Sequence, residues 1–306
     1  MTLTQLKYIA AVDTHRHFGQ AAEECHISQP TLSMQIKKLE QELGIQVFDR
    51  SRKPVVPTDV GREVIAQARE VLRESRRIPN LISELSSEMV GTLRIGVIPT
   101  LAPYLLPHVT PEFSEQYPGV ELVIEELITE QILHELEREA LDAGLVATDM
   151  SDRDVRQQAL FEEPFVAYVS PDHRFANQKL VESSDLSLDD LWLLKEGHCF
   201  RDQVLQVCGQ ESQACGAMRS ILFESGSLET LRNTVDSVGG MTLLPYLATL
   251  YLTDEQMETH VKPFRSPTPR REISVVYRRE YLKKHLIDAF TTIVFDRLPP
   301  ELLETG

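Results

Sequence analysis

Two cysteines, Cys199 and Cys208, lie nine residues apart in the run Gly-His-Cys-Phe-Arg-Asp-Gln-Val-Leu-Gln-Val-Cys. Two thiols in one short run can exchange between a reduced and a disulfide-bonded form, so the pair is a candidate redox switch. If the run is helical, its ends lie about 13 Å apart on opposite faces, whereas a disulfide needs α-carbons closer than about 7 Å. A bond between these cysteines would therefore require the segment to unfold.

The residues beside Cys199 suit a reactive thiol. His198 precedes it and Arg201 follows it, and a neighbouring cation or the start of a helix favours the thiolate. His198 and Asp202 are the nearest candidate proton donors or relays. A single cysteine or histidine is more often a packed, hydrogen-bonded core residue. The occurrence of all of them in one short run favours the redox interpretation.

The composition indicates an ordinary protein of two or three domains. Of its 306 residues 42% are hydrophobic and 25% charged, and neither a signal segment nor an apolar run of membrane-spanning length is evident. We therefore expect a cytoplasmic protein without a membrane partner. The irregular spacing of the four cysteines fits neither a disulfide framework nor a zinc site, so we predict no metal and no cofactor. We expect Cys25 to pack as a small apolar residue, and Cys215 to be inert or an alternative partner for Cys199.

The charge is unevenly distributed along the chain. The net charge of −16 argues at first against nucleic acid, because binding to the phosphate backbone needs cations. Residues 1–90, however, hold 12 basic and 12 acidic side chains, so the remainder carries the whole excess of acid. Basic residues cluster in this neutral part of the chain, namely Lys37, Lys38, Arg50, Arg52 and Lys53.

Three short helices are predicted in this part of the chain, over 4–15, 18–25 and from Ser28 to Gly44. Ser28 can cap the third helix, Pro30 suits its first turn, and Gly44 can end it. The apolar spacing predicts a core face made of Leu32, Ile36, Leu39 and Leu43. The opposite face carries short hydrogen-bonding side chains suited to base edges and phosphates, namely Gln29, Thr31, Ser33, Gln35 and Lys37.

The stretch AAEECHISQPTLSMQIKKLEQELGIQVFDRSRK resembles the winged helix-turn-helix of the LysR-type transcriptional regulators. The resemblance implies promoter DNA and RNA polymerase as partners. It also implies DNA-binding roles for residues of the third helix and of the hairpin wing, namely Gln29, Pro30, Thr31, Ser33, Lys37, Arg50 and Arg52. The alternative is a three-helix structural module with a solvated polar face.

The sequence from Thr58 to Met89 predicts one long helix. Apolar residues from Val64 onward alternate steps of four and three, which indicates a seam that needs a partner helix. In the LysR family such a linker pairs two subunits, so we expect a homodimer that assembles further into a homotetramer. Pro79 predicts a kink or break near Ile78, because an interior proline removes a hydrogen bond.

After Met89 the pattern changes to alternating strands and helices. Strands over 92–98, 120–127 and 143–147 and helices over 105–117 and 129–140 predict a βαβαβ unit. Further strands are predicted near 165–170, 192–194, 221–223, 241–244 and 272–278, and helices near 228–237 and 281–298. The resemblance implies an α/β effector domain with two subdomains, like a periplasmic binding protein. We predict DNA-binding, linker and effector domains over 1–58, 59–89 and 90–306, with subdomain I at 90–161 and 270–306 and subdomain II at 162–269.

The segments IPTLAPYLLPHVTP, EGHCFRDQVLQVC, SLETLRN and TLLP resemble the peroxide-sensing members of the same family. That resemblance implies that hydrogen peroxide oxidises Cys199 and that Cys208 then forms a disulfide with it. It also implies that Thr100 and Thr129 contribute hydroxyls and that Arg271 contributes a cation. A LysR-type sensor of a small metabolite is the alternative, and a thiol peroxidase enzyme is a more distant one. We expect a regulator, not an enzyme.

Overall fold

The computed structural model describes residues 1–306 except 87–88, 151–154, 210–224, 279–282 and 304–306. It divides into two compact units, 1–88 and 89–306. The predicted class is confirmed, with a winged helix-turn-helix in the first unit and an α/β fold in the second. In the part of the chain that is described, no helix is long and apolar enough to cross a membrane. The finer domain and subdomain boundaries stay predictions.

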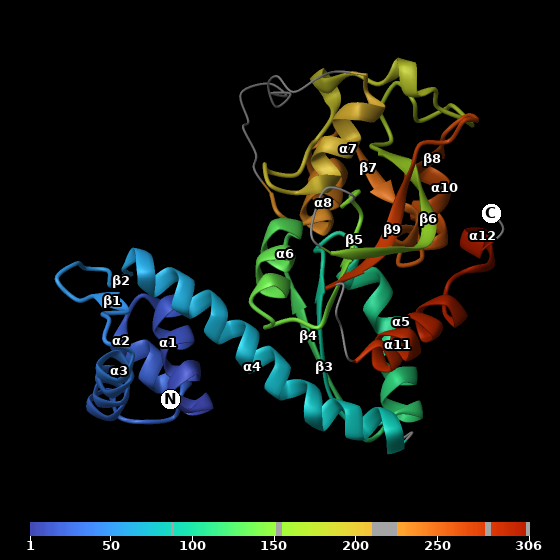
Figure 1. Cartoon of the computed structure of the whole chain (residues 1–306). Helices are drawn as coiled ribbons and strands as arrows, with labels where there is room; N and C mark the ends of the chain where they lie inside the picture. Colours follow the sequence, from blue (N-terminus) through green and yellow to red (C-terminus); the bar gives the residue numbers. More distant parts are fainter. Residues whose placement is uncertain (87–88, 151–154, 210–224, 279–282, 304–306) are drawn as a thin grey trace. The chain divides into compact units, whose positions relative to one another are not determined.

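The first unit packs three short helices, the first turns of a longer fourth helix and a short hairpin around one core (Figure 1). Cys25 packs against this core, as predicted. The hairpin strands β1 and β2 pair in antiparallel fashion, and the wing residues lie between them. The elements are α1 Leu3–His15, α2 Phe18–Glu24, α3 Gln29–Leu43, β1 Phe48–Asp49, β2 Val56–Pro57 and α4 Asp59–Ser86.

Helix α3 begins and ends where its sequence predicts. The Ser28 hydroxyl accepts a hydrogen bond from the Thr31 backbone N–H at 3.3 Å, and Gly44 ends the helix in the left-handed conformation at φ 69°. The core face is confirmed for Leu32, Ile36 and Leu39, which are fully buried. The fourth residue predicted there, Leu43, is 39% exposed. It lies in the last turn, where the chain leaves the core.

Helix α4 is continuous through Pro79, so a break near Ile78, one of the two predicted effects of this proline, is wrong, and a kink there stays a prediction. A proline removes one hydrogen bond, and a helix of 28 residues keeps the turns on either side of it. The first turns of the predicted seam also have a partner within the chain. Ala68 is buried and Val64 partly buried in the core shared with α1, whereas Val71 is 36% exposed.

The second unit is built on a mixed sheet with strand order β4-β3-β5-β9-β6-β7, and β8 also pairs with β6. Strands β3 (Gly91–Val97), β4 (Val120–Glu126) and β5 (Ala143–Val146) are parallel, with α5 (Ala102–Gln116) and α6 (Thr129–Glu137) between them in sequence. This arrangement confirms the predicted βαβαβ unit.

Two long strands, β6 (Arg156–Val169) and β9 (Arg270–Tyr277), run antiparallel and side by side through the middle of this unit (Figure 1). β9 also pairs with β5, while β6 continues to β7 (Met241–Pro245) and β8 (Val261–Pro263). The sequence predicted only the second half of β6, because its first half is mostly polar. These strands connect the side of the sheet that holds β3, β4 and β5 to the side that holds β7 and β8.

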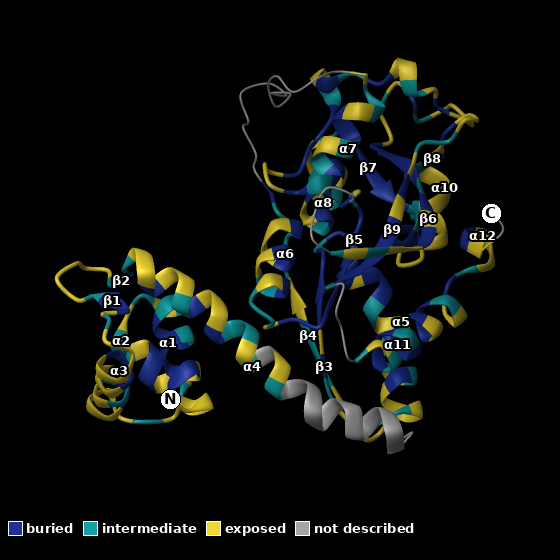
Figure 2. Cartoon of the chain, in the orientation of Figure 1, coloured by how far each residue is buried: buried dark blue, intermediate teal, exposed yellow. Residues whose placement is uncertain are grey.

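The remaining helices are mostly amphipathic, with buried faces toward the strands and exposed outer faces (Figure 2). The predicted strand near Trp192 is reduced to isolated bridges at Leu191 and Leu194. The strand predicted at 221–223, like Cys215, lies outside the described residues. The elements are two 3-10 turns at Ser183–Asp185 and Leu188–Asp190, α7 Cys199–Val207, α8 Leu228–Val238, α9 Tyr246–Thr249, α10 Asp254–His260, α11 Lys284–Asp296 and α12 Pro300–Leu303.

Candidate redox site and DNA-binding surface

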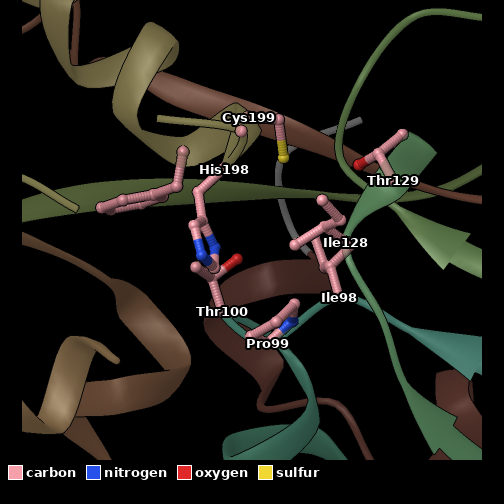
Figure 3. Close-up of a pocket in the computed structure, with 9 residues that line it drawn as sticks. Ile98, Pro99, Thr100, Ile128, Thr129, His198 and Cys199 are labelled. Atoms are coloured by element: carbon pink, nitrogen blue, oxygen red, sulfur yellow. The ribbon is translucent and has the colours of Figure 1, made fainter. Parts of the chain in front are cut away.

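A small pocket forms where the end of β3 and the amino ends of α6 and α7 meet (Figure 3). The carboxyl edge of parallel strands is a common place for ligand sites in α/β proteins. The chain thus brings three segments, distant in sequence, around Cys199. The lining residues are Ile98, Pro99, Thr100, Ile128, Thr129, Gly197, His198, Cys199 and Phe200.

Cys199 is the first residue of α7, and its thiol is free and partly exposed. The first N–H groups of a helix have no partner within the helix and carry partial positive charge, which favours a thiolate there. Phe200 fixes this turn, because its ring is buried edge-on against Phe165 with centroids 5.3 Å apart. Gln203 holds α7 at a second point, because its Nε2 donates a hydrogen bond to Ala147 O at 2.5 Å.

Two threonine hydroxyls face the pocket with hydrogen-bonding capacity to spare. Thr100 Oγ1 accepts from Arg271 Nη1 at 2.8 Å, so its own proton is free for another acceptor. Thr129 Oγ1 is buried and has no hydrogen-bond partner among the described residues. Figure 3 shows it turned toward the Cys199 sulfur. A buried unsatisfied hydroxyl is costly, so the pocket suits a small polar ligand.

His198 is buried beside the thiol, with its ring extending toward Thr100 (Figure 3). Burial, followed by the charge of Lys195, lowers the pKa of His198. The ring is therefore neutral near pH 7, because burial and a nearby cation both disfavour the imidazolium. It does not supply the positive charge that its place in the sequence suggested, but a neutral imidazole can still relay a proton.

Two further residues predicted near the thiol lie away from it. Arg201 Nη1 donates to Leu194 O at 3.0 Å. Asp202 is exposed and does not line the pocket, so the structure does not bring it to the Cys199 sulfur. Its position in the first turn of α7 directs it to solvent.

Arg271 lies behind Thr100, outside the pocket lining. Its Nη2 donates a hydrogen bond to Thr100 O at 3.0 Å, and its Nε donates one to Glu163 Oε2 at 2.9 Å. The guanidinium also lies over the Phe200 ring, with Cζ 5.3 Å from the ring centre. Sequence reasoning missed Glu163. It faces Arg271 only through the pairing of β6 with β9, which no local pattern reveals.

Cys208 is the residue that ends α7, at the opposite end from Cys199. Its thiol is free, and burial, together with the charge of Asp190, raises the pKa of Cys208 to about 11. It is therefore a thiol near pH 7. Because a helix of this length separates them, the two sulfur atoms are not in position to bond.

The proposed DNA-contacting residues of α3 lie at the surface. Gln29, Pro30, Thr31 and Lys37 are exposed, and Ser33 is partly exposed. Their exposure leaves these side chains accessible to a major groove, and their DNA-binding roles stay a prediction.

The wing arginines are held differently from each other. Arg50 pairs with Glu40 at 2.9 Å and donates to Ser33 at 3.2 Å, while Glu40 also accepts from the Val47 N–H. Arg50 thus fixes the wing to α3, and its partly exposed guanidinium also places a positive charge at the surface. Arg52 is 72% exposed and pairs only weakly with Asp49, at 3.3 Å.

In the part of the chain that is described, no group of three His, Cys, Asp or Glu side chains is arranged to hold a metal ion. The site chemistry described above uses only the chain's own thiols, hydroxyls and imidazole.

Two family models match the chain, one within the first unit and one over nearly all of the second. Residues 3–62 match the bacterial regulatory helix-turn-helix protein of the lysR family, and residues 86–299 match the LysR substrate binding domain. The chain is 40% identical over 280 residues to a hydrogen peroxide-inducible genes activator of Dickeya chrysanthemi, covering 91% of this chain and 90% of that one. The DNA-binding transcriptional dual regulator OxyR of Escherichia coli has the same identity and coverage. The chain belongs to the OxyR group of the LysR family.

Solved OxyR structures agree with this assignment. A full-length cysteine-to-aspartate mutant of Pseudomonas aeruginosa OxyR has a TM-score of 0.79 and 36% identity, covering 99% of this chain and 97% of that one. A hydrogen-peroxide-bound cysteine mutant of Corynebacterium glutamicum OxyR has a TM-score of 0.63 and 29% identity, covering 97% and 92%. The similarity to OxyR thus extends over both units of the chain.

Proposed function

We propose that this chain is a transcriptional regulator that senses hydrogen peroxide through Cys199 and Cys208. The observation that carries the proposal is the Thr129 hydroxyl, which is buried without a described partner and turned toward the Cys199 sulfur. A small polar molecule in this pocket would satisfy it. The relatives named for hydrogen peroxide support the choice of that molecule.

The oxidation proceeds in two balanced steps. The Cys199 thiolate attacks one peroxide oxygen, an S–O bond forms and the O–O bond breaks, and the departing hydroxide takes a proton to become water. Thr100, Thr129 and His198 are the groups that orient the peroxide and supply this proton. The Cys208 thiol then gives up its proton as its sulfur attacks the sulfenic sulfur, the S–O bond breaks and the hydroxyl leaves as water, which gives a disulfide.

Arg271 and Asp202 take lesser parts in this proposal than the sequence suggested. Arg271 acts through Thr100, to which it donates, and not by direct contact with the peroxide. Asp202 is exposed at the start of α7 and can act only after a rearrangement of the helix. The output is a changed conformation that alters DNA binding, so peroxide is consumed once per switch and not turned over as in an enzyme.

Mass spectrometry of peroxide-treated protein tests the proposal directly. A Cys199–Cys208 disulfide formed by one equivalent of peroxide, together with altered promoter binding, supports it. A protein that binds a metabolite without any dependence on its thiols would favour the metabolite sensor. Many turnovers of peroxide per protein would favour the thiol peroxidase.

We further propose a cytoplasmic dimer of dimers that acts on promoter DNA and RNA polymerase. The family of the chain supports this, as does the seam residue Val71, which is exposed on α4 although its neighbour Leu72 packs against the core. We expect sedimentation at micromolar concentration to give a tetramer, and the footprint to cover two half-sites. A monomer, or a footprint over one half-site, would contradict this assembly.

For the recognition helix, we expect Thr31→Ala to weaken binding to a specific promoter by about 1–3 kcal/mol and to leave binding to random DNA nearly unchanged. Thr31 is exposed in the first turn of α3, where base edges are reached. Gln29→Ala should behave in the same way, and Arg52→Ala should weaken binding to all sequences. Equal losses on specific and random DNA for Thr31→Ala, measured by titration, would count against direct base contact.

A further inference from the structure

Beside the redox pocket lies an ion pair without exposed side-chain surface. Arg271 on β9 and Glu163 on β6 are cross-strand partners, with Nη2 and Oε2 2.8 Å apart and both side chains 0% exposed. A second pair on the same strands, Arg270 and Glu162, also lies at 2.8 Å, but its side chains are 36% and 47% exposed. The two pairs share residue types and strands and differ in burial.

The groups of the buried pair are directed at fixed partners. Arg271 donates to Glu163 from Nε and Nη2, to Thr100 Oγ1 from Nη1 and to Thr100 O from Nη2. The second Glu163 oxygen accepts from the Leu247 N–H at 2.9 Å. Glu163 therefore balances the charge of Arg271 and also holds its guanidinium against Thr100.

The pocket itself presents little positive charge. Its lining contains no Lys or Arg, and its one histidine is buried. Of the basic groups at this end of α7, Lys195 is exposed, so water and salt screen its charge, and Arg201 donates to Leu194 O. Arg271 donates a hydrogen bond to the lining residue Thr100 from the side away from the pocket, and its charge is paired with Glu163.

We propose that Glu163 is a specificity-determining and positioning residue that neutralises Arg271, so that the pocket accepts an uncharged oxidant and disfavours anions. The inference rests on the proposed peroxide-sensing function. A buried guanidinium without a counter-ion would attract anions strongly, because charges interact more strongly away from water. Paired with Glu163, the same group serves as an oriented donor that leaves the Thr100 proton free.

The first test uses the unaltered protein and two alkylating reagents of similar size, neutral iodoacetamide and anionic iodoacetate. Alkylation of the Cys199 peptide is followed by mass spectrometry, and N-acetylcysteine amide serves as the uncharged reference thiol. We expect the iodoacetate-to-iodoacetamide rate ratio at Cys199 to be no higher than that of the reference. A ratio about 10-fold higher would show the Arg271 charge in the pocket and overturn the proposal.

The second test removes the counter-charge. Glu163→Gln should raise the ratio about 10-fold, whereas Glu162→Gln, the matched exposed variant, should leave it unchanged. The double variant Glu163→Gln with Arg271→Gln should return the ratio to that of the unaltered protein. A general disturbance of the fold would change both reagents together and leave the ratio constant.

An unchanged ratio in folded Glu163→Gln, or an equal rise in Glu162→Gln, would overturn the proposal. If Glu163→Gln fails to fold, the measurement on the unaltered protein still decides. No peroxide is used in either test. Failure of peroxide sensing, read from disulfide mapping, is therefore distinguishable from failure of this charge-pairing role.

Discussion

Cys199→Ser is expected to abolish the peroxide response, with oxidation slowed at least about 100-fold and DNA binding insensitive to peroxide. A serine hydroxyl keeps the size of the thiol but is not ionised near pH 7, so it cannot attack the O–O bond. Because Cys199 is partly exposed at the start of α7, the free energy of unfolding should change by no more than about 1 kcal/mol. Stopped-flow thiol titration and a promoter footprint measure the two outcomes.

Cys208→Ser separates the two chemical steps. The sulfenic acid should still form on Cys199 and be trapped by dimedone, but the switched state should not persist, because no disulfide can follow. Cys25→Ser is the matched control, since Cys25 packs in the helix-turn-helix core. A lasting response from Cys208→Ser, or a lost response from Cys25→Ser, would contradict the assignment of the pair.

The disulfide has a structural cost that makes it a switch. Its two sulfur atoms lie at opposite ends of α7, so the helix must unwind before they meet. The buried side chains Phe200, Val204 and Leu205 would then leave the core, at about 1.5–3 kcal/mol each. We therefore expect hydrogen exchange across residues 199–209 to rise on oxidation. The free energy of forming the S–S bond would offset the cost of exposing these side chains.

Local rules were sufficient where a feature depends on neighbours in the sequence. The ends of α3 were predicted from single residues: the Ser28 side chain caps the helix, Pro30 fits its first turn, and Gly44 adopts the left-handed conformation that ends it. The structure has α3 begin and end at these residues. The βαβαβ unit follows from the alternation of apolar runs in the same way. The positions of Thr100 and Thr129 in the pocket came from a resemblance, because neither is marked by any local pattern.

The features that sequence reasoning missed depend on tertiary contacts. Glu163 is recognisable only from the register of β6 with β9, and its neighbour Glu162 looks alike in sequence yet is exposed. His198 is neutral because it is buried, which lowers its pKa. The spacing of apolar residues does not predict whether a residue at the start of a helix is buried. For Asp202 the sequence predicted too much. It is three residues from Cys199 in the chain, but its side chain does not line the pocket that contains the thiol.

Thr129→Val is expected to slow oxidation of Cys199 by peroxide about 10- to 100-fold, because one hydrogen bond to developing charge is worth about 1.5–3 kcal/mol. The substitution keeps the shape of the side chain and removes a hydroxyl that no described residue satisfies. For the same reason the free energy of unfolding should rise or stay level, since a buried unsatisfied polar group destabilises the protein without ligand. Lower reactivity with undiminished stability is the expected signature.

Thr148→Val is the matched control, because Thr148 Oγ1 is also buried without a described partner but does not line the pocket. It should leave the peroxide rate unchanged. Alkylation of Cys199 by iodoacetamide decides how Thr129 acts, since that reagent reports the thiolate and needs no peroxide positioning. If alkylation slows as much as oxidation in Thr129→Val, the hydroxyl stabilises the thiolate instead of orienting peroxide. If oxidation keeps its full rate, the unsatisfied hydroxyl has no part in the reaction, and the pocket loses its main argument as a peroxide site.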